Sequence, residues 1–323
     1  MAVLVTGGTG FVGLNIVEAL LARRQMVVVL DRAEPPAAAA SALAALGTVA
    51  WRQGDVTDSA TLDAAFREHG IDRLVQGAAI TADAAREARA ARRIAEVNLL
   101  GSIEVLEAAR RHGVGRVVYL SSASVYGENS FADPELDEAT TPPLPDSLYA
   151  ITKYAGERTA LRYITLFGME VAVARLSGVF GPWERDTGVR DTLSPIHQAT
   201  TAALAGSEVV LARTGTRDWV YAPDVASAVA TLLLQERPPA HTVYNVGPGT
   251  VWSVADWCRK LQQRRPDFAW RLGDDVTIDL HGDRDRSPLA IRRLTEDTDW
   301  RPEFGLEAAF EHYMTWLERQ APE

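Results

Sequence analysis

The sequence predicts an α/β protein with a doubly wound parallel sheet and a smaller C-terminal lobe. Short apolar runs alternate with helix-like patterns over the first half of the 323 residues. These runs are continuously apolar, as in parallel strands that are covered on both faces. A glycine-rich turn also follows the first run directly and opens the first helical pattern. Strands and helices in this alternation form right-handed βαβ units.

The expected elements follow from the apolar periodicity. Buried strands are predicted at residues 2–5, 26–30, 49–53, 73–76, 116–121 and 171–175. Helices are predicted at residues 11–23, 59–69, 91–112 and 148–167. An alanine-rich stretch at 37–45 is expected to form a helix or loop on the solvent side.

After about residue 175 the pattern loosens, and Gly and Pro punctuate shorter elements. We therefore predict a first domain at 1–175 with a return near 215–246, and a discontinuous lobe at 176–323. Within this second part, a helix is expected at 224–235, a strand at 243–246 and a closing helix at 306–317.

The turn after the first strand predicts a dinucleotide site. Gly7, Gly10 and Gly13 are spaced three apart, and Phe11 and Val12 begin the helix between them. The first glycine permits a tight turn, the second lets a diphosphate approach the backbone, and the third lets helix and strand pack closely. Because strand, turn and helix occur in the required order, we predict a Rossmann-type fold.

The choice of dinucleotide rests on Asp31, which ends the second predicted strand. A carboxylate there accepts hydrogen bonds from the adenosine ribose and repels a 2′-phosphate, which favours NAD over NADP. Arg32 beside it could accommodate such a phosphate or be a solvated loop charge, and we favour the loop charge. Asp55 follows the third strand and is predicted to bind the adenine amino group, or else to be a turn residue.

Composition excludes several classes of function. A net charge of −10 argues against a nucleic-acid surface or a polybasic membrane contact, and no apolar run reaches membrane-spanning length. The lone Cys258 cannot form an internal disulfide, and the first strand begins almost at Met1, so a cytoplasmic protein without a signal peptide is expected. The six scattered histidines predict no metal site.

Tyr149 and Lys153 are the candidate reaction centre. All but two of the 33 basic residues are arginine, and lysine occurs only at 153 and 260. Side chains four residues apart share one face of a helix, so the ammonium can lower the pKa of the phenol and make a phenolate base available. A guanidinium is broader and fixed in charge. The alternative is an ordinary surface pair at helical spacing.

The motifs together resemble the extended short-chain dehydrogenase/reductases, the NAD-dependent epimerase/dehydratase family, over nearly the whole chain. The matching segments are residues 6–13, 55–56, 77–79, 97–101, 121–127, 149–153, 175–182, 217–224, 244–247 and 300–302. The resemblance implies that Ser122, Tyr149 and Lys153 are catalytic. It further implies that Val56, Ala78, Ala79 and Asn98 bind the cofactor, and that Ser124 contacts substrate.

Three positions bear on the substrate. Dehydratases of this family carry acidic residues just after the catalytic hydroxyl, where this chain has Ala123 and Ser124, so a 4,6-dehydratase is not expected. Gly178 replaces an asparagine that usually contacts the sugar nucleotide. Arg217 matches the arginine that grips an anionic group of the substrate, with a structural ion pair as the alternative.

The resemblance leaves two activities open. We favour an NAD-dependent epimerase of a sugar or sugar nucleotide; the alternative is an NAD-dependent dehydrogenase of a sugar, sugar acid or other small secondary alcohol. An idle NAD-sensing protein is disfavoured by the intact Ser122, Tyr149 and Lys153. Helices 91–112 and 148–167 pair across a two-fold axis in much of the family, so the resemblance implies a homodimer. The alternative is that the apolar stripes of these helices belong to the core of a single chain.

Overall fold

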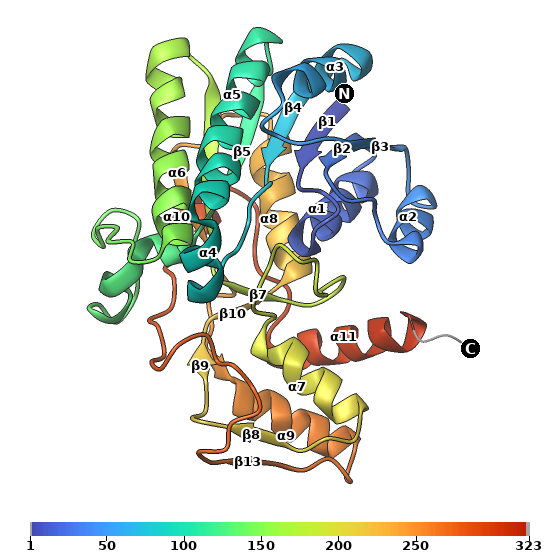
Figure 1. The fold of residues 1–323 in the computed structure, drawn as a ribbon, viewed down its shortest axis with the longest axis vertical. Helices are drawn as coiled ribbons and strands as arrows, with labels where there is room; N and C mark the ends of the chain where they lie inside the picture. The colour runs from blue at the N-terminus through green and yellow to red at the C-terminus, as the bar shows by residue number, and fades with distance from the viewer. Residues whose placement is uncertain (1, 321–323) are drawn as a thin grey trace.

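The computed structural model describes residues 2–320 and places a seven-stranded sheet above a smaller lobe (Figure 1). The strands lie in the order β11-β6-β5-β4-β1-β2-β3, and every neighbouring pair is parallel. Their bounds are β1 Ala2–Thr6, β2 Met26–Asp31, β3 Val49–Gln53, β4 Ile71–Gln76, β5 Arg116–Ser122, β6 Glu170–Leu176 and β11 Val243–Val246. The chain order reverses between β1 and β4, where doubly wound sheets bind their ligands. The predicted fold class is confirmed.

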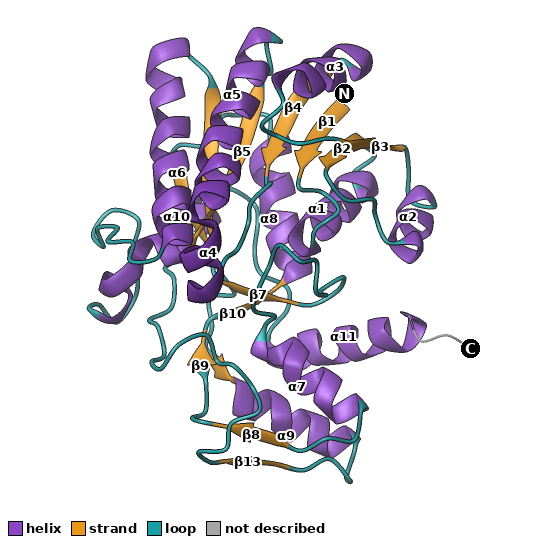
Figure 2. Cartoon of the chain, viewed as in Figure 1, coloured by secondary structure: helices purple, strands orange, loops and turns teal. Residues whose placement is uncertain are grey.

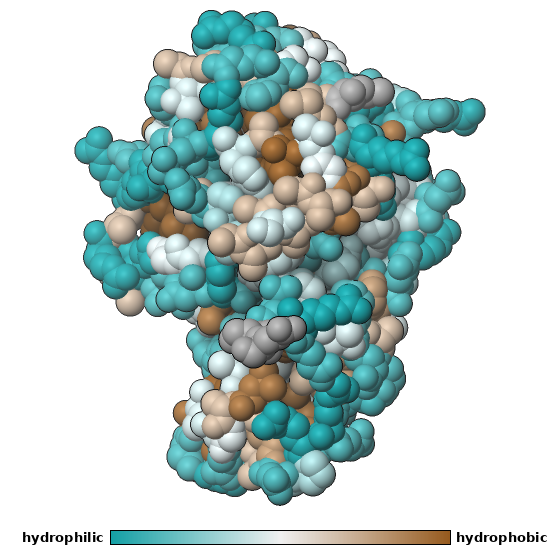
Figure 3. All heavy atoms as spheres, turned by 90° about the vertical axis from the view of Figure 1, so that its right-hand side faces the viewer, coloured by the Kyte–Doolittle hydropathy of each residue, from teal (hydrophilic) through white to brown (hydrophobic). Residues whose placement is uncertain are grey.

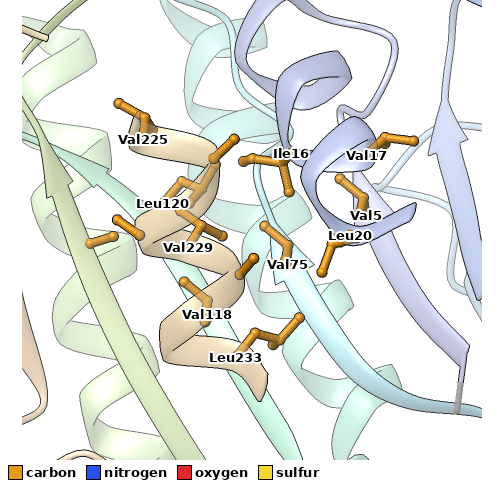
Figure 4. Close-up of a cluster of buried hydrophobic side chains, with 14 of the residues drawn as sticks. Val5, Ile16, Val17, Leu20, Val75, Val118, Leu120, Val225, Val229 and Leu233 are labelled. Carbon is orange, nitrogen blue, oxygen red and sulfur yellow. The ribbon is translucent and has the colours of Figure 1, made fainter. Parts of the chain in front are cut away.

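Helices cover both faces of the sheet. One face is covered by α1 (Phe11–Ala22) and α8 (Ala222–Leu234), with α2 (Ala37–Ala44) beside them. Their apolar side chains meet those of β1, β4 and β5 in one buried cluster (Figure 4). The other face carries α3 (Ser59–His69), α5 (Gly101–Arg111) and α6 (Leu148–Phe167). Because helices cover both faces of the sheet, most strand residues on both faces are buried and apolar.

The predicted helix at 91–112 begins earlier and is interrupted. Helix α4 (Ala84–Ala95) starts where Asp83 accepts a hydrogen bond from the backbone N–H of Arg86 at 2.7 Å. A π-helical turn, η1 (Glu96–Leu100), then joins α4 to α5. Such turns are rare and frequently accompany functional sites, and this one carries Asn98.

The lobe is built from short strands and three longer helices (Figure 2). The helices are α7 (Pro195–Leu204), α9 (Val254–Arg264) and α11 (Leu306–Gln320). The strands are β8 Val209–Leu211, β9 Thr216–Arg217, β12 Trp252–Ser253 and β13 Trp270–Leu272. Buried aromatic rings, among them Phe180, Trp257 and Tyr313, fill the space between them. The pair β7 (Gly178–Phe180) and β10 (Trp219–Tyr221) connects this lobe to the sheet domain.

Two further short elements complete the described chain. The segment η2 (Ala123–Phe131) follows β5, and α10 (Arg292–Asp297) precedes α11. The face in Figure 3 is mostly hydrophilic, with scattered apolar areas and a narrowing between the sheet domain and the lobe. Among residues 2–320, no helix is long and apolar enough to cross a membrane.

Candidate active site

A cleft of about 1100 Å³ lies at the carboxyl ends of the central strands and extends toward the lobe. All but one of the predicted site residues line it. They are Gly7, Gly10, Phe11, Val12, Gly13, Asp31, Arg32, Asp55, Val56, Ala78, Ala79, Ser122, Ser124, Tyr149, Lys153, Gly178 and Arg217. Residues from distant parts of the sequence therefore converge on one cavity of the size that ligand sites have.

The glycine turn needs glycine at two positions for steric reasons. Gly7 has a φ of +70°, and a Cβ on it would lie 2.8 Å from the backbone of Ala78. A Cβ on Gly13 would lie only 2.3 Å from the carbonyl oxygen of Gly7. Helix α1 then begins with no side-chain cap and no acidic residue in its first turn. Its free N–H groups and positive dipole end can hold an anion.

Acidic side chains mark the far end of the cleft. Asp31 accepts hydrogen bonds from the backbone N–H of Thr9 at 3.1 Å and of Ala33 at 3.2 Å. Asp55 forms an ion pair with Arg93 at 2.5 Å, and the largely exposed Arg32 lies 3.6 Å from the same carboxylate. Burial alone would raise the pKa of Asp55, but hydrogen bonds from Thr57 and Arg93 outweigh it and lower that pKa. Arg32 is thus drawn toward Asp55.

Asn98 lies behind the cleft and does not line it. Its buried amide accepts from the backbone N–H of Ile80 at 2.7 Å and donates to the carbonyl of Ile80 at 2.9 Å. It also donates to the hydroxyl of Thr152 on α6 at 3.2 Å. The structure shows Asn98 fixing the loop that follows β4, whose next residue, Thr81, does line the cleft.

The candidate reaction centre forms where β5 ends and α6 begins. Ser122 is the last residue of β5, and its Oγ accepts from the N–H of Ser124 at 3.2 Å. Ser147 caps α6, which places Tyr149 and Lys153 in its first two turns. Burial dominates and raises the pKa of the Tyr149 phenol, although hydrogen bonds with Ser122 and Thr81 and the charge of Arg190 oppose this rise. Burial therefore favours the neutral phenol, while these three partners favour the ionised form.

Lys153 is almost fully buried, with its Nζ 4.6 Å from the centre of the Tyr119 ring. Burial lowers the pKa of Lys153 to about 8, although the nearby Glu157 opposes this. Glu157 lies one turn further along α6 and forms a buried ion pair with Arg175 at 2.6 Å. It also accepts from the hydroxyl of Ser121 at 2.8 Å, which ties α6 to β5 and β6.

The lobe end of the cleft is positively charged. Arg217 has no carboxylate within 4 Å among residues 2–320, and its guanidinium lies 5.1 Å from the centre of the Trp219 ring. Burial, followed by the charge of Arg286, lowers the pKa of Arg217 to about 9. Nearby, the buried Oγ of Ser124 has no hydrogen-bond partner among the described residues. An unpaired cation and a free hydroxyl suit an anionic, hydroxylated ligand.

Gly178 packs directly against Trp219. A Cβ at this position would lie 2.8 Å from two atoms of the indole ring, so a side chain here requires the ring to shift. The cleft is therefore lined at this point by bare backbone beside Arg217. No three His, Cys, Asp or Glu side chains within residues 2–320 are grouped so as to hold a metal ion.

Several residues near the reaction centre escaped the sequence analysis. Thr81, Arg185 and Arg190 lie in loops whose sequence carries no periodic signal, and only the fold brings them to the cleft. Glu157 was missed although a signal existed, since it continues the four-residue spacing of Tyr149 and Lys153. Trp183, which follows Gly181 and Pro182 near the cleft, does not line the cavity, because its ring packs against Trp316.

Comparison with known proteins identifies the family of the chain. The family model for the NAD dependent epimerase/dehydratase family matches residues 3–247. The chain is 32% identical over 260 residues to the dTDP-glucose 4,6-dehydratase of Streptomyces niveus, covering 77% of this chain and 73% of that protein. It is 26% identical to the dTDP-L-rhamnose 4-epimerase of Burkholderia thailandensis, covering 98% of this chain and 95% of that protein.

A solved structure shares the whole architecture. The UDP-glucose 4-epimerase of Thermus thermophilus, in complex with NAD, is 29% identical and superposes with a TM-score of 0.82. The match covers 99% of this chain and 100% of that one. The chain belongs to the NAD dependent epimerase/dehydratase family of enzymes.

Proposed function

We propose that the protein is an NAD-dependent epimerase of a sugar or sugar nucleotide that works by reversible hydride transfer at a secondary alcohol carbon. The single observation that carries this proposal is the convergence of Ser122, Tyr149 and Lys153 on the cleft that also contains the glycine turn. The rest of the site is compatible with a reaction that needs no additional acid or base.

The residues at the sheet end of the cleft fit a dinucleotide. The turn at Gly7 and Gly13 has no room for side chains, and the uncapped start of α1 faces the cavity. When bound, NAD would supply the hydride acceptor and return the same hydride. Asp31 supports NAD over NADP, because its carboxylate would repel a 2′-phosphate. The NAD-bound Thermus relative is consistent with this assignment.

Each residue of the reaction centre has a definite task. Ser122 donates a hydrogen bond to the reacting oxygen and holds it beside the phenol. Tyr149 accepts the hydroxyl proton as the C–H electron pair leaves the same carbon as hydride, so that the alcohol becomes a ketone. Lys153 keeps the phenolate favourable through its charge. Hydride return to the opposite face of the ketone, with the proton given back by Tyr149, completes an epimerisation.

The residues after Ser122 favour this reaction over dehydration. Loss of water from a sugar needs proton transfer at carbons beside the ketone, and therefore further acid and base groups. Ala123 and Ser124 provide no carboxylate at that point of the cleft. Relatives of both kinds exist, including the 32% identical dehydratase, so the products must be identified directly. A 4-keto-6-deoxy sugar as product would contradict the proposal.

A second candidate is a dehydrogenase of a sugar, sugar acid or other small secondary alcohol. The lobe end of the cleft favours it in one respect. Gly178 contributes no polar side chain, while the unpaired Arg217 would hold a carboxylate as well as a phosphate. Thermal-shift screening with UDP-sugars, dTDP-sugars, GDP-sugars and sugar acids separates the two substrate classes, because a bound ligand raises the apparent Tm. A response to sugar acids alone would favour the dehydrogenase.

A further inference from the structure

The segment 182–194, which we call the strap, crosses the cleft from α1 to α4. At its start, Asn15 on α1 donates to the carbonyl of Pro182 at 2.8 Å, and the indole N–H of Trp183 donates to Glu18 at 3.2 Å. Trp183 has a φ of +66°, a left-handed conformation that is rare for a large side chain. These contacts fix the start of the strap beside the first turns of α1.

The other end of the strap is tied to the loop that precedes α4. Thr81 donates its backbone N–H to the carbonyl of Val189 at 2.8 Å and accepts from the N–H of Asp191 at 3.1 Å. Arg86 then grips the carboxylate of Asp191 with two nitrogens, at 2.7 and 2.5 Å. The strap is thus held on both sides of the cleft, and its middle residues line the cavity.

Arg185 is the strap residue that reaches the glycine turn. Its Nη2 donates to the carbonyl of Thr9 at 2.7 Å, and its Nη1 donates to the carbonyl of Trp183 at 3.3 Å. No carboxylate within residues 2–320 lies close enough to form an ion pair with it. Burial lowers the pKa of Arg185, while the charge of Asp31 opposes this. A partly buried cation without a counter-charge is costly unless a ligand supplies one.

Arg190, the other strap arginine in the cleft, already has a carboxylate partner. It forms an ion pair at 3.1 Å with the buried carboxylate of Glu184, and its guanidinium lies 5.1 Å from the centre of the Phe11 ring. Glu184 is held in turn by the N–H and hydroxyl of Ser194, at 2.6 and 2.7 Å. Of the two arginines, Arg185 is the one free to take an anion.

We propose that Arg185 is a cofactor-binding residue that contacts the diphosphate of the dinucleotide beside the start of α1. The geometry supports this because Arg185 touches Thr9, which lies within the turn that leads into α1. A planar guanidinium suits phosphate oxygens, and the glycine turn itself contributes no cationic side chain. The inference rests on the proposed use of NAD.

The experiment compares three ligands on the full-length protein after removal of bound cofactor. Isothermal titration gives the Kd of NAD, ADP-ribose and adenosine for the wild type, Arg185→Gln and Arg185→Lys. Loss of a charge-assisted hydrogen bond is expected to weaken NAD and ADP-ribose by about tenfold to a hundredfold in Arg185→Gln. Adenosine has no diphosphate, so its Kd stays unchanged. Arg185→Lys keeps the charge and recovers part of the affinity.

The matched control is Arg89→Gln, which removes an equal charge from an exposed position of α4 outside the cleft. It is expected to leave all three Kd values unchanged. An equal loss for adenosine in Arg185→Gln would mean that Arg185 only shapes the turn, and would overturn the proposal.

The binding of NAD and ADP-ribose to the wild type and to Arg185→Gln separates failure of the Arg185 proposal from failure of the proposed cofactor. If the wild type bound neither NAD nor ADP-ribose, the NAD-dependent function would fall and this assignment with it. If the wild type bound both and Arg185→Gln bound them equally well, only the role of Arg185 would be refuted. Melting temperatures of the variants, measured without ligand, show whether each is folded.

Discussion

The phenol of Tyr149 and the ammonium of Lys153 lie one helical turn apart on α6 and face the same cleft as Ser122. Other groups near this pair lie outside the Tyr149–Lys153 motif. Thr81 interacts with the phenol, Arg190 adds a positive charge, and Glu157 lies beyond the lysine. The reactivity of the pair therefore depends on a loop and a strap as well as on its own helix.

Replacing Tyr149 by Phe tests the proposed base. The variant keeps the ring but loses the group that accepts the proton, so turnover should fall by about 10² to 10⁴-fold. Bound NAD should be retained, because the glycine turn is unaffected. Tyr154→Phe is the matched control, since Tyr154 is on the same helix and outside the cleft. Near-normal turnover in Tyr149→Phe would refute the assignment.

The pKa of Lys153 can be measured directly because the chain has only two lysines. Selective ¹³C labelling of lysine should give two NMR signals, and Lys260→Arg removes one of them for assignment. Because burial lowers the pKa of Lys153 to about 8, its signal should titrate near that pH in the cofactor-free protein. Titration near the ordinary value of about 10.4 would contradict the buried environment.

The same shift has a consequence for stability. Between pH 8 and the ordinary lysine pKa, the unfolded chain binds a proton that the folded chain has lost. The contribution of Lys153 to the free energy of unfolding therefore rises with pH across this range. Activity should move the other way above about pH 8, since the ammonium that favours the phenolate is lost.

At the scale of elements, α6 owes its position to a close approach to β5. A Cβ on Gly156 would lie 2.2 Å from the hydroxyl oxygen of Tyr119, so Gly156→Ala forces the helix and strand apart. We expect a loss of about 1–3 kcal/mol in the free energy of unfolding, together with lower activity. Chemical denaturation measures the first and steady-state kinetics the second.

The double variant Gly156→Ala with Tyr119→Phe supplies the control for this mechanism. Removing the hydroxyl makes room for the new methyl group, so part of the stability should return. Gly305→Ala should change little, because nothing lies within 4 Å of a Cβ there. A Gly156→Ala variant as stable as the wild type would show that the close contact between Gly156 and Tyr119 does not position α6.

The sheet elements could be predicted because strands such as β1 and β2 are apolar on both faces, which few other structures require. The lobe could not be predicted in detail. Strands β9 and β12 have two residues each, too few to show a period, and α4 starts at the cap of Asp83 rather than at an apolar repeat. In the site, motif residues were predictable, whereas Thr81 and Arg190 reach the cleft only through tertiary folding.

At the scale of the whole molecule, α6 and η1 carry exposed apolar side chains outside the cleft. Leu100 and Ile151 are 53% and 47% exposed. We propose that this face forms the two-fold interface of a homodimer. Light scattering should give the mass of two chains for the wild type, and Ile151→Asp should shift it toward one. A monomeric wild type at micromolar concentration would contradict this.

We propose that residues 1–175 with the return through α8 and β11 hold NAD, and that the lobe within 176–323 holds the substrate. The cleft contains residues from both, including Asp31 and Arg217 at its two ends. The reaction centre at Ser122 and Tyr149 stands between them, where a hydride can pass from one ligand to the other.

In the proposed epimerisation, one hydride leaves the substrate and returns to it without release of reduced cofactor. The most direct measurement follows absorbance at 340 nm during turnover of a substrate found by thermal shift, with the products identified by NMR. We expect an epimer to form over many turnovers, with NADH never exceeding the concentration of active sites. NADH that accumulates in proportion to an oxidised product would contradict it and establish a dehydrogenase.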